Sequence, residues 1–374
     1  MKSQPRLASR LGILLTLTML ALLACRAGGQ GDRAATSTPA GVTEAASPAG
    51  APTETSQPEP TAAPAEPTSA PAEPTAVPAA LPYQTGRNDF VTTVDGVPRE
   101  WLVYVPASYA AGQPAPVVFM FHGSNQGGPL MYENTTWSDQ ADQHGILVVF
   151  PTGWKYPLVD EAGRHSKWNT RGLVNQVQPG TELMDDVHFV QVMLAELQAT
   201  FSVDTHRVYA TGFSNGAGFV LTRLIPEMST TFAAYATAGS GLMSEERLEA
   251  ELPVVPASLY SVLGTQDQKV AENTGYPLPF PVQTEAMLVD PLLGPMFVNT
   301  TDLLGLELDY TAEVDEATGS NILTFNTSPS GVGNQYIFRM VDRMGHVYPS
   351  GHNNRHELDV APLFWDFFGQ YSLP

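Results

Sequence analysis

One serine of this chain lies in a setting that could make it a nucleophile. The stretch Val208–Leu221 reads VYATGFSNGAGFVL, so a β-branched and aromatic run passes through Gly-x-Ser-x-Gly into an apolar segment of small residues. A strand that turns abruptly into a helix holds the residue at the turn in a strained conformation, and glycines two positions away leave space for that turn. We predict that Ser214 lies on such a turn, with its hydroxyl exposed above the C-terminal edge of a sheet.

Activation of a serine hydroxyl requires a base and a group that orients the base. Where the serine lies on a strand-to-helix turn, an acid and then a histidine follow it along the chain. Asp267 follows an apolar run, and His346 follows the predicted strand 336–341 and lies next to a glycine, whereas His352 and His356 lie in a polar stretch. We predict Asp267 as the acid and His346 as the base, against the alternatives of a turn aspartate and a surface histidine.

Two backbone N–H groups could stabilise the negative charge that develops on a carbonyl oxygen when the serine attacks. His122, Gly123 and Ser124 follow a predicted buried strand, and the glycine allows the backbone to turn its N–H groups inward. We predict that the N–H groups of Ser124 and Asn215 form this oxyanion hole. The ring of His122 is interpreted as a structural group that hydrogen-bonds the loop.

Asp185 and Asp186 are adjacent carboxylates that could be mistaken for an acid and base pair. They precede a run with apolar residues at helical spacing between residues 187 and 201. Carboxylates at the start of a helix cap free N–H groups, and neighbouring residues on a helix point in different directions. We interpret both as structural.

Alternating strands and helices must position these side chains. Two runs joined through Asp-Gly predict a β-hairpin over 90–105. Further strands are predicted at 116–121, 146–151, 257–263, 336–341 and directly before Ser214, and helices around 137–143, over 184–201 and over 364–371. This alternation predicts one α/β domain over residues 83–374, with a mostly parallel central sheet flanked by helices.

Several motifs in this domain resemble one enzyme family. They are Arg99–Pro106 (REWLVYVP), Phe121-His122-Gly123, Trp137 with Ala141-Asp142, Asp185-Asp186-Val187, Gly212–Ala217 (GFSNGA), Gly264-Thr265 before Asp267, and Gly345-His346. Jointly and in this order they resemble the α/β-hydrolase esterases grouped as polyhydroxybutyrate depolymerases, feruloyl esterases and related acetyl esterases.

The resemblance implies an α/β-hydrolase fold with a nucleophile elbow, and it implies the same roles for Ser214, Asp267 and His346. It also implies that Trp168 lies near the acyl pocket and binds substrate. The chain departs from the family where Leu263 replaces the usual histidine before Gly-Thr, and where the insert 268–345 separates the acid from the base. This insert could form a lid or a substrate wall, so the natural ester remains open.

The first 24 residues have the pattern of an export signal. A basic start precedes the apolar run 11–23, and Leu-Leu-Ala leads to Cys25, the only cysteine of the chain. Leu-Leu-Ala-Cys resembles the lipobox of bacterial lipoproteins, which implies cleavage before Cys25 and its lipidation, with a plain secretory signal as the alternative. Residues 25–82 are rich in Ala, Pro, Thr and Glu and repeat APAEPT, so we predict a disordered tether there.

The balance of charge disfavours one class of partner. The chain has 18 Lys and Arg against 38 Asp and Glu, a net charge of −20, which repels the phosphate backbone of nucleic acids. No motif for a metal or a nucleotide is present in the sequence, so no cofactor and no metal are expected.

Together these features predict a serine esterase anchored through Cys25 to the outer face of a bacterial membrane, or secreted. Its expected substrates are short or soluble hydroxyalkanoate, feruloyl or acetyl esters. A serine peptidase of the same fold and a catalytically inactive surface-binding protein are the alternatives.

Overall fold

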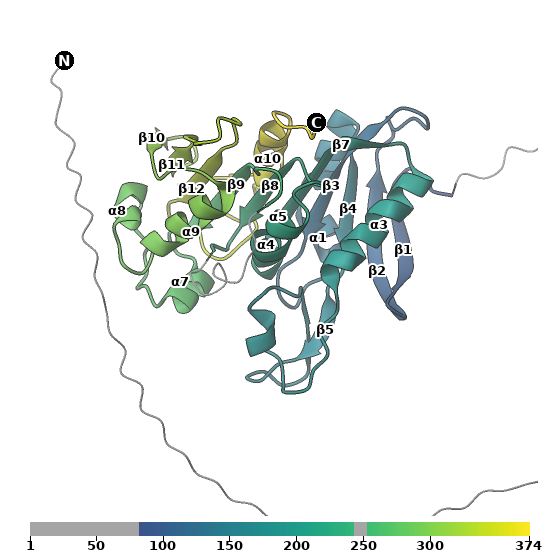
Figure 1. Ribbon diagram of the computed structural model, residues 1–374, viewed down its shortest axis with the longest axis horizontal. Helices are drawn as coiled ribbons and strands as arrows, with labels where there is room; N and C mark the ends of the chain where they lie inside the picture. The colour runs from purple at the N-terminus through teal and green to yellow at the C-terminus, as the bar shows by residue number, and fades with distance from the viewer. Residues whose placement is uncertain (1–81, 243–252) are drawn as a thin grey trace, which may run out of the picture. The chain divides into compact units, whose positions relative to one another are not determined.

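A computed structural model describes residues 82–242 and 253–374 of the chain (Figure 1). The predicted signal peptide 1–24, Cys25 and the predicted tether as far as residue 81 lie outside the described residues. The described residues form a ten-stranded sheet with helices packed on it and a separate two-stranded sheet. Within these two ranges, none of the helices has the length and apolar character needed to cross a membrane.

The large sheet has the strand order β1-β2-β4-β3-β7-β8-β9-β12-β11-β10. Its strands are β1 (Gly86–Val94), β2 (Val97–Val105), β3 (Ala115–Phe121), β4 (Leu147–Pro151), β7 (Val203–Phe213), β8 (Ala234–Ala238), β9 (Leu259–Gly264), β10 (Tyr310–Asp315), β11 (Ser320–Phe325) and β12 (Tyr336–Val341). The small sheet pairs β5 (Trp154–Pro157) with β6 (Arg164–Lys167). Strands β4, β3, β7, β8, β9 and β12 are mutually parallel, so their C-terminal ends meet at one edge of the sheet.

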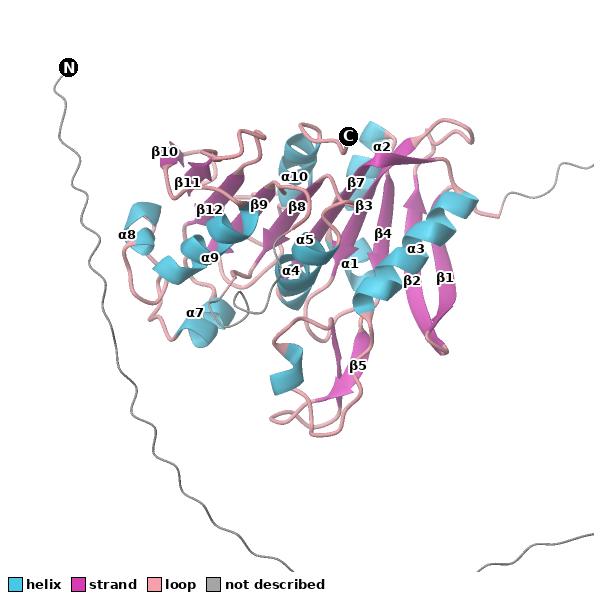
Figure 2. Ribbon diagram, in the orientation of Figure 1, coloured by secondary structure: helices cyan, strands magenta, loops and turns pink. Residues whose placement is uncertain are grey.

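The helices lie on both faces of the large sheet (Figure 2). They are α1 (Gly128–Asn134), α2 (Trp137–His144), the 3-10 turn η1 (Leu173–Asn175), α3 (Asp186–Thr200), α4 (Asn215–Phe219), the π-helical turn η2 (Val220–Leu224), α5 (Ile225–Glu227), α7 (Gln268–Thr274), α8 (Thr284–Leu288), α9 (Gly294–Leu304) and α10 (Val360–Phe368). Buried side chains of α3, α4 and α9 pack on one face, and those of α1, α2 and α10 pack on the other.

Strand β3 shows how the sequence produces this layered arrangement. All seven of its residues are buried. Val117, Phe119 and Phe121 pack into the cluster on one face, and Val118 and Met120 pack into the cluster on the other. A continuous apolar run is the pattern of a parallel strand that is covered on both sides. The predicted α/β-hydrolase architecture, with a mostly parallel sheet between helices, is confirmed.

The predicted hairpin is also present, as β1 and β2. Val94 pairs with Val97, and between them Asp95 and Gly96 have φ values of 51° and 79°. A two-residue hairpin turn of this kind needs positive φ at both positions, which aspartate tolerates and glycine favours.

The insert between Asp267 and His346 has two parts. Its first part forms α7, α8 and α9. In its second part, β10 pairs with β11 and β11 pairs with β12, both antiparallel, so this part extends the sheet. The insert therefore does not form a lid over its whole length.

Candidate active site

The end of β7 makes the sharp turn that the sequence predicts. Phe213 is the last residue of β7 and Asn215 is the first of α4. Between them, Ser214 has φ 52° and ψ −115°, a combination of backbone angles that residues other than glycine rarely adopt. The turn holds the hydroxyl of Ser214 at the C-terminal edge of the sheet.

The two glycines around Ser214 are required by close backbone contacts. A Cβ atom at Gly216 would lie 2.3 Å from the carbonyl oxygen of Phe121. A Cβ atom at Gly212 would lie 2.5 Å from the carbonyl carbon of Gly216. Both partners are backbone atoms that cannot move aside independently. The sequence pattern therefore reflects the packing of α4 directly against the ends of β3 and β7.

The structure brings Ser214, His346 and Asp267 together. The Nε2 atom of His346 lies 2.9 Å from the Oγ atom of Ser214. Its Nδ1 atom lies 2.9 Å from Oδ1 and 3.0 Å from Oδ2 of Asp267. With the proton on Nδ1 shared with the carboxylate, Nε2 is free to accept the proton of the serine hydroxyl. This arrangement can generate a serine nucleophile.

Two different elements position the carboxylate and the imidazole. Asp267 is the N-cap of α7 and its Oδ1 atom accepts a hydrogen bond from the Val270 N–H at 3.0 Å. Its side chain is almost completely buried. His346 lies in the loop after β12, where its ring centroid is 5.0 Å from that of Phe213. The helix N-terminus stabilises the negative charge of the carboxylate that orients the histidine.

The two amides predicted as an oxyanion hole come from two segments that meet at Ser214. Asn215 is the first residue of α4, and such a position has no intrahelical acceptor for its N–H. Ser124 follows Gly123, whose ideal Cβ position is 3.2 Å from the Cβ atom of Ser214. The N–H of Gly123 is occupied, because it donates to Oε1 of Gln126 at 2.9 Å. The Ser124 N–H makes no such bond within the described residues, and both amides are available to an anionic oxygen.

His122 is completely buried and its ring ties together two loops. Gly153 donates its N–H to Nε2 at 2.8 Å, so the ring proton lies on Nδ1, which donates to the Gly123 carbonyl at 2.7 Å. Burial lowers the pKa of His122 to about 4. The ring is therefore neutral near pH 7, and both of its nitrogens are used structurally.

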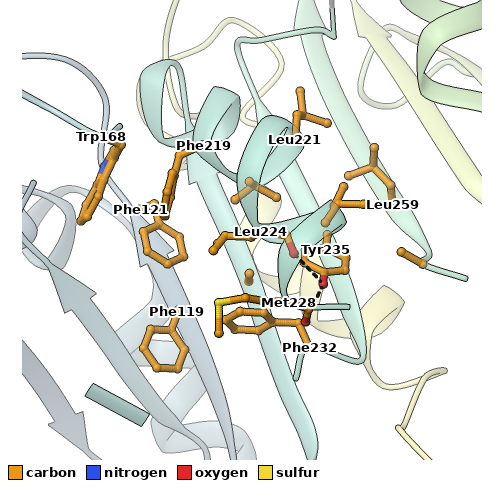
Figure 3. Packing of buried hydrophobic residues seen from close by; sticks show 14 of the residues in the cluster. Phe119, Phe121, Trp168, Phe219, Leu221, Leu224, Met228, Phe232, Tyr235 and Leu259 are labelled. Carbon is orange, nitrogen blue, oxygen red and sulfur yellow. Dashed lines mark hydrogen bonds between the residues drawn. The ribbon is translucent and has the colours of Figure 1, made fainter. Parts of the chain in front are cut away.

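The structure corrects the expectation that Trp168 contacts substrate. Its side chain has no exposed surface. The indole is stacked on Phe219 and meets Phe121 edge to face (Figure 3). A residue surrounded by core side chains cannot form the wall of a pocket, so the Trp168 side chain is part of the core. The sequence alone could not show this, because Phe121 and Phe219 come from distant segments.

Asp185 and Asp186 are both structural, but they differ in what they bind. Oδ1 of Asp185 caps α3, accepting the N–H groups of Val187 and His188 at 3.1 and 3.0 Å. Asp186 does not act as a cap. Its carboxylate is buried, pairs with Arg99 and accepts the N–H of Asn169 at 2.7 Å. The expectation that both aspartates cap the helix is therefore wrong for Asp186.

Two arginines that the sequence did not single out anchor the segment after Trp168. Nε of Arg171 donates to the carbonyl of Thr222 at 3.0 Å, within the π-helical turn η2. Nη1 of Arg223 donates to the carbonyl of Asn169 at 3.1 Å. A π-helical turn leaves backbone carbonyls without their usual helical partners, and Arg171 satisfies one of them.

Two further observations on the described residues lie apart from Ser214. Within residues 82–242 and 253–374, no three His, Cys, Asp or Glu side chains converge as metal ligands would. A cleft of about 330 Å³ beside Tyr109 and His144 lies where β3 and β4 begin, opposite the edge that carries Ser214. The candidate active site is therefore the group around Ser214.

Comparison with known proteins gives one family. Residues 100–250 match the family described as Esterase PHB depolymerase. Poly(3-hydroxyalkanoate) depolymerase C of Paucimonas lemoignei is 29% identical over 140 residues, which cover 37% of this chain and 30% of that protein. Feruloyl esterase B of Piromyces equi is 26% identical over 184 residues, covering 47% and 31%. The matches confirm the resemblance stated from the motifs.

The similarity is partial in length and in structure. The chain spans less than a third of the length of either of these two relatives. Among solved structures, the acetyl xylan esterase from Aspergillus awamori aligns with a TM-score of 0.49 at 14% identity, covering 75% of this chain and 99% of that one.

Proposed function

We propose that this chain, whose residues 100–250 match the esterase PHB depolymerase family, is an exported serine esterase that hydrolyses carboxylic esters. The observation that carries the proposal is the continuous hydrogen-bonded line from the Ser214 hydroxyl through His346 to Asp267. The strained turn at Ser214 and the available amides of Ser124 and Asn215 support it.

The geometry supports a two-step mechanism. Oγ of Ser214 attacks the ester carbonyl carbon while Nε2 of His346 takes the hydroxyl proton, and Asp267 stabilises the imidazolium. The carbonyl oxygen becomes an oxyanion that accepts the N–H groups of Ser124 and Asn215. Collapse of this intermediate expels the alcohol, which receives the proton from His346. Water then attacks the acyl-serine, His346 takes its proton, and the carboxylic acid leaves as Ser214 regains a proton.

The proposed substrates are short or soluble hydroxyalkanoate esters, with feruloyl and acetyl esters as the other members of the class. The first follows the depolymerase named by the family, the feruloyl esters follow the named activity of feruloyl esterase B, and the acetyl esters follow the resemblance of the sequence motifs. The insert 268–345 contributes α7 beside Asp267, so we place part of the substrate specificity there.

The proposal extends to the location of the enzyme. The pattern Leu-Leu-Ala-Cys and the Pro-rich stretch that follows it support lipidation at Cys25 and a tether to the outer face of a membrane. Secretion without a lipid is the alternative.

A labelling experiment tests the chemistry directly. A fluorophosphonate probe should label the purified full chain, and peptide mapping should place the label on Ser214 with no label on Ser214→Ala. A separate, unlabelled sample of the enzyme should then be assayed for product release from 3-hydroxybutyrate oligomers, feruloyl esters, acetylated sugars and matched amides. A chain that is not labelled, or that cleaves amides faster than esters, contradicts the proposal.

A further inference from the structure

We propose that Trp168 is a positioning residue that fixes the two oxyanion-hole amides relative to each other. This inference rests on the proposed esterase function, because it concerns how the same site stabilises its oxyanion. It assigns to Trp168 a role through its two N–H groups and not through contact with substrate.

The two N–H groups of Trp168 bind the two segments that carry the oxyanion-hole amides, which we call the two arms of the site. The indole Nε1–H donates to the carbonyl oxygen of His122 at 2.9 Å. The backbone N–H donates to Oδ1 of Asn215 at 2.7 Å. One arm carries the Ser124 amide two residues after His122, and the other arm carries the Asn215 amide itself. Trp168 therefore connects the end of β3 with the start of α4.

The segment that ends in Ser124 is held at two successive carbonyls, that of His122 by Trp168 and that of Gly123 by other groups. The next carbonyl, that of Gly123, accepts from Nδ1 of His122 at 2.7 Å and from the Gln126 N–H at 3.3 Å. A peptide unit is planar, with its C=O and N–H pointing in opposite directions. Holding the Gly123 carbonyl therefore fixes the direction of the Ser124 N–H.

Trp168 is itself held rigidly. Its ring centroid is 5.4 Å from that of Phe219 in a stacked arrangement and 5.2 Å from that of Phe121 in an edge arrangement (Figure 3). Phe219 is part of α4 and Phe121 is the last residue of β3, so the indole packs on both arms that its N–H groups bind. The next residue, Asn169, is fixed by Asp186 and Arg223.

This arrangement matters because an oxyanion hole acts only where both donors lie about 2.7–3.1 Å from the developing charge. Complete loss of one donor reduces kcat by about 10²–10³-fold. Loss of a Trp168 hydrogen bond leaves both donor N–H groups present but less well placed. We therefore expect a smaller effect, on the order of tenfold in kcat, with KM changed by less than about twofold.

The test is Trp168→Phe, which keeps an aromatic ring between Phe121 and Phe219 and removes the indole N–H. The chain offers a matched control in Trp101, whose buried Nε1–H has no hydrogen-bond partner within the described residues. Trp101→Phe deletes the same group from another buried tryptophan. Both variants are compared with the full-length wild type in kcat and KM on a soluble ester, in unfolding by urea, and in affinity for a trifluoromethyl ketone.

The trifluoromethyl ketone separates positioning from a general loss of stability. Ser214 adds to its carbonyl to form a tetrahedral oxyanion, so its affinity reports the hole in the folded enzyme. For Trp168→Phe we expect kcat and this affinity to fall by similar factors, with KM nearly unchanged, and for Trp101→Phe we expect neither to fall. Equal changes in kcat and in ketone affinity for the two variants would overturn the inference.

A second variant acts on the other contact of Trp168. Asn215→Ala removes the Oδ1 acceptor and leaves the Asn215 backbone amide in place. We expect a loss of kcat similar to that of Trp168→Phe. The double variant should be little worse than either single variant, because both changes break the same connection that Trp168 makes between the two amides. Full additivity contradicts the inference. A wild type that the fluorophosphonate does not label overturns the proposed function and this inference together, whereas a labelled wild type with an unaffected Trp168→Phe overturns the inference alone.

Discussion

Arg99 and Asp186 form an ion pair with almost no exposed surface. Nη2 of Arg99 lies 2.6 Å from Oδ1 of Asp186, and the two side chains are 2% and 0% exposed. The guanidinium also lies over the ring of Phe189, 4.0 Å from its centroid. Burial raises the pKa of the Asp186 carboxyl and the Arg99 charge opposes this. The pair connects β2 to the start of α3 and holds the segment that begins at Asn169.

Removing one partner of this pair should strongly destabilise the fold. Arg99→Met leaves the Asp186 carboxylate buried without its counter-charge, and we expect the free energy of unfolding to fall by about 3–5 kcal/mol. The measurement is urea unfolding followed by circular dichroism. Glu272→Ala, which breaks an exposed pair with Lys269, should have no measurable effect. Similar losses in the two variants contradict this account.

The three residues of the proposed triad should behave as one unit. Ser214→Ala and His346→Ala should each reduce kcat by at least about 10⁴-fold without changing the urea midpoint by much, and the double variant should be little worse. Asp267→Asn should also lose most activity, because the amide cannot stabilise the imidazolium. If His346→Ala retains the wild-type rate while His352→Ala does not, the base is wrongly assigned.

The close contact at the elbow predicts different outcomes for two glycines of one helix. Gly216→Ala places a Cβ atom 2.3 Å from the Phe121 carbonyl oxygen and should reduce the free energy of unfolding by at least about 2 kcal/mol. A Cβ atom at Gly218 meets nothing closer than the Thr170 side chain at 3.4 Å. Gly218→Ala should be neutral or stabilising by up to about 1 kcal/mol, since alanine favours helix. Thermal and urea unfolding of both variants test this difference.

His122 should make the protein less stable in mild acid. Its pKa in the folded protein is about 4, below the ordinary value of 6.5. Below pH 6.5 the unfolded chain gains a proton that the folded chain takes up only near pH 4. As the pH is lowered from 6.5 to 4, the free energy of unfolding should therefore fall by up to about 3 kcal/mol. Above pH 6.5 the stability linked to neutral His122 is fully present.

The contribution of His122 can be isolated by comparing variants. His122→Asn should show a shallower fall in stability from pH 6.5 to 4 than the wild type, whatever its stability at neutral pH. His206→Asn, which changes an exposed histidine, should keep the wild-type slope. An unchanged slope in His122→Asn contradicts the assignment.

Lipidation at Cys25 predicts a change in where the protein is found. In a bacterial host, Cys25→Ser should release the chain from membranes or prevent its processing, because the serine cannot form the thioether to lipid. Metabolic labelling with a fatty-acid analogue checks this: the wild type should carry label and Cys25→Ser should not. Equal labelling of the two proteins would sink the lipoprotein proposal.

The sequence predicted the central elements because their patterns are strong. The apolar run of β3, the strand β12 and the turn at Ser214 all appear where they were expected. Strand β8 was missed because Ala234–Ala238 is rich in alanine, which favours helix and is depleted in strands. Strand β10 was missed because its residues are mostly exposed and show no alternation.

The roles of Trp168 and Asp186 could not be predicted because both depend on distant partners. Trp168 binds His122 and Asn215, which are 46 and 47 positions away. Asp186 pairs with Arg99 across 87 positions. The position of Asp186 at a helix start and the position of Trp168 in a polar loop did not indicate either contact.

The order of strands in the sheet has a consequence for the way the chain refolds. Ser214 and His346 are 132 positions apart in sequence, and His346 lies in the loop after β12, which pairs in parallel with β9. Contacts between distant segments form late because closing long loops is entropically slow. The elbow can therefore assemble while the histidine is still absent. After dilution from urea, hydrolysis should recover more slowly than the helical circular dichroism signal, so that a compact but inactive species accumulates first.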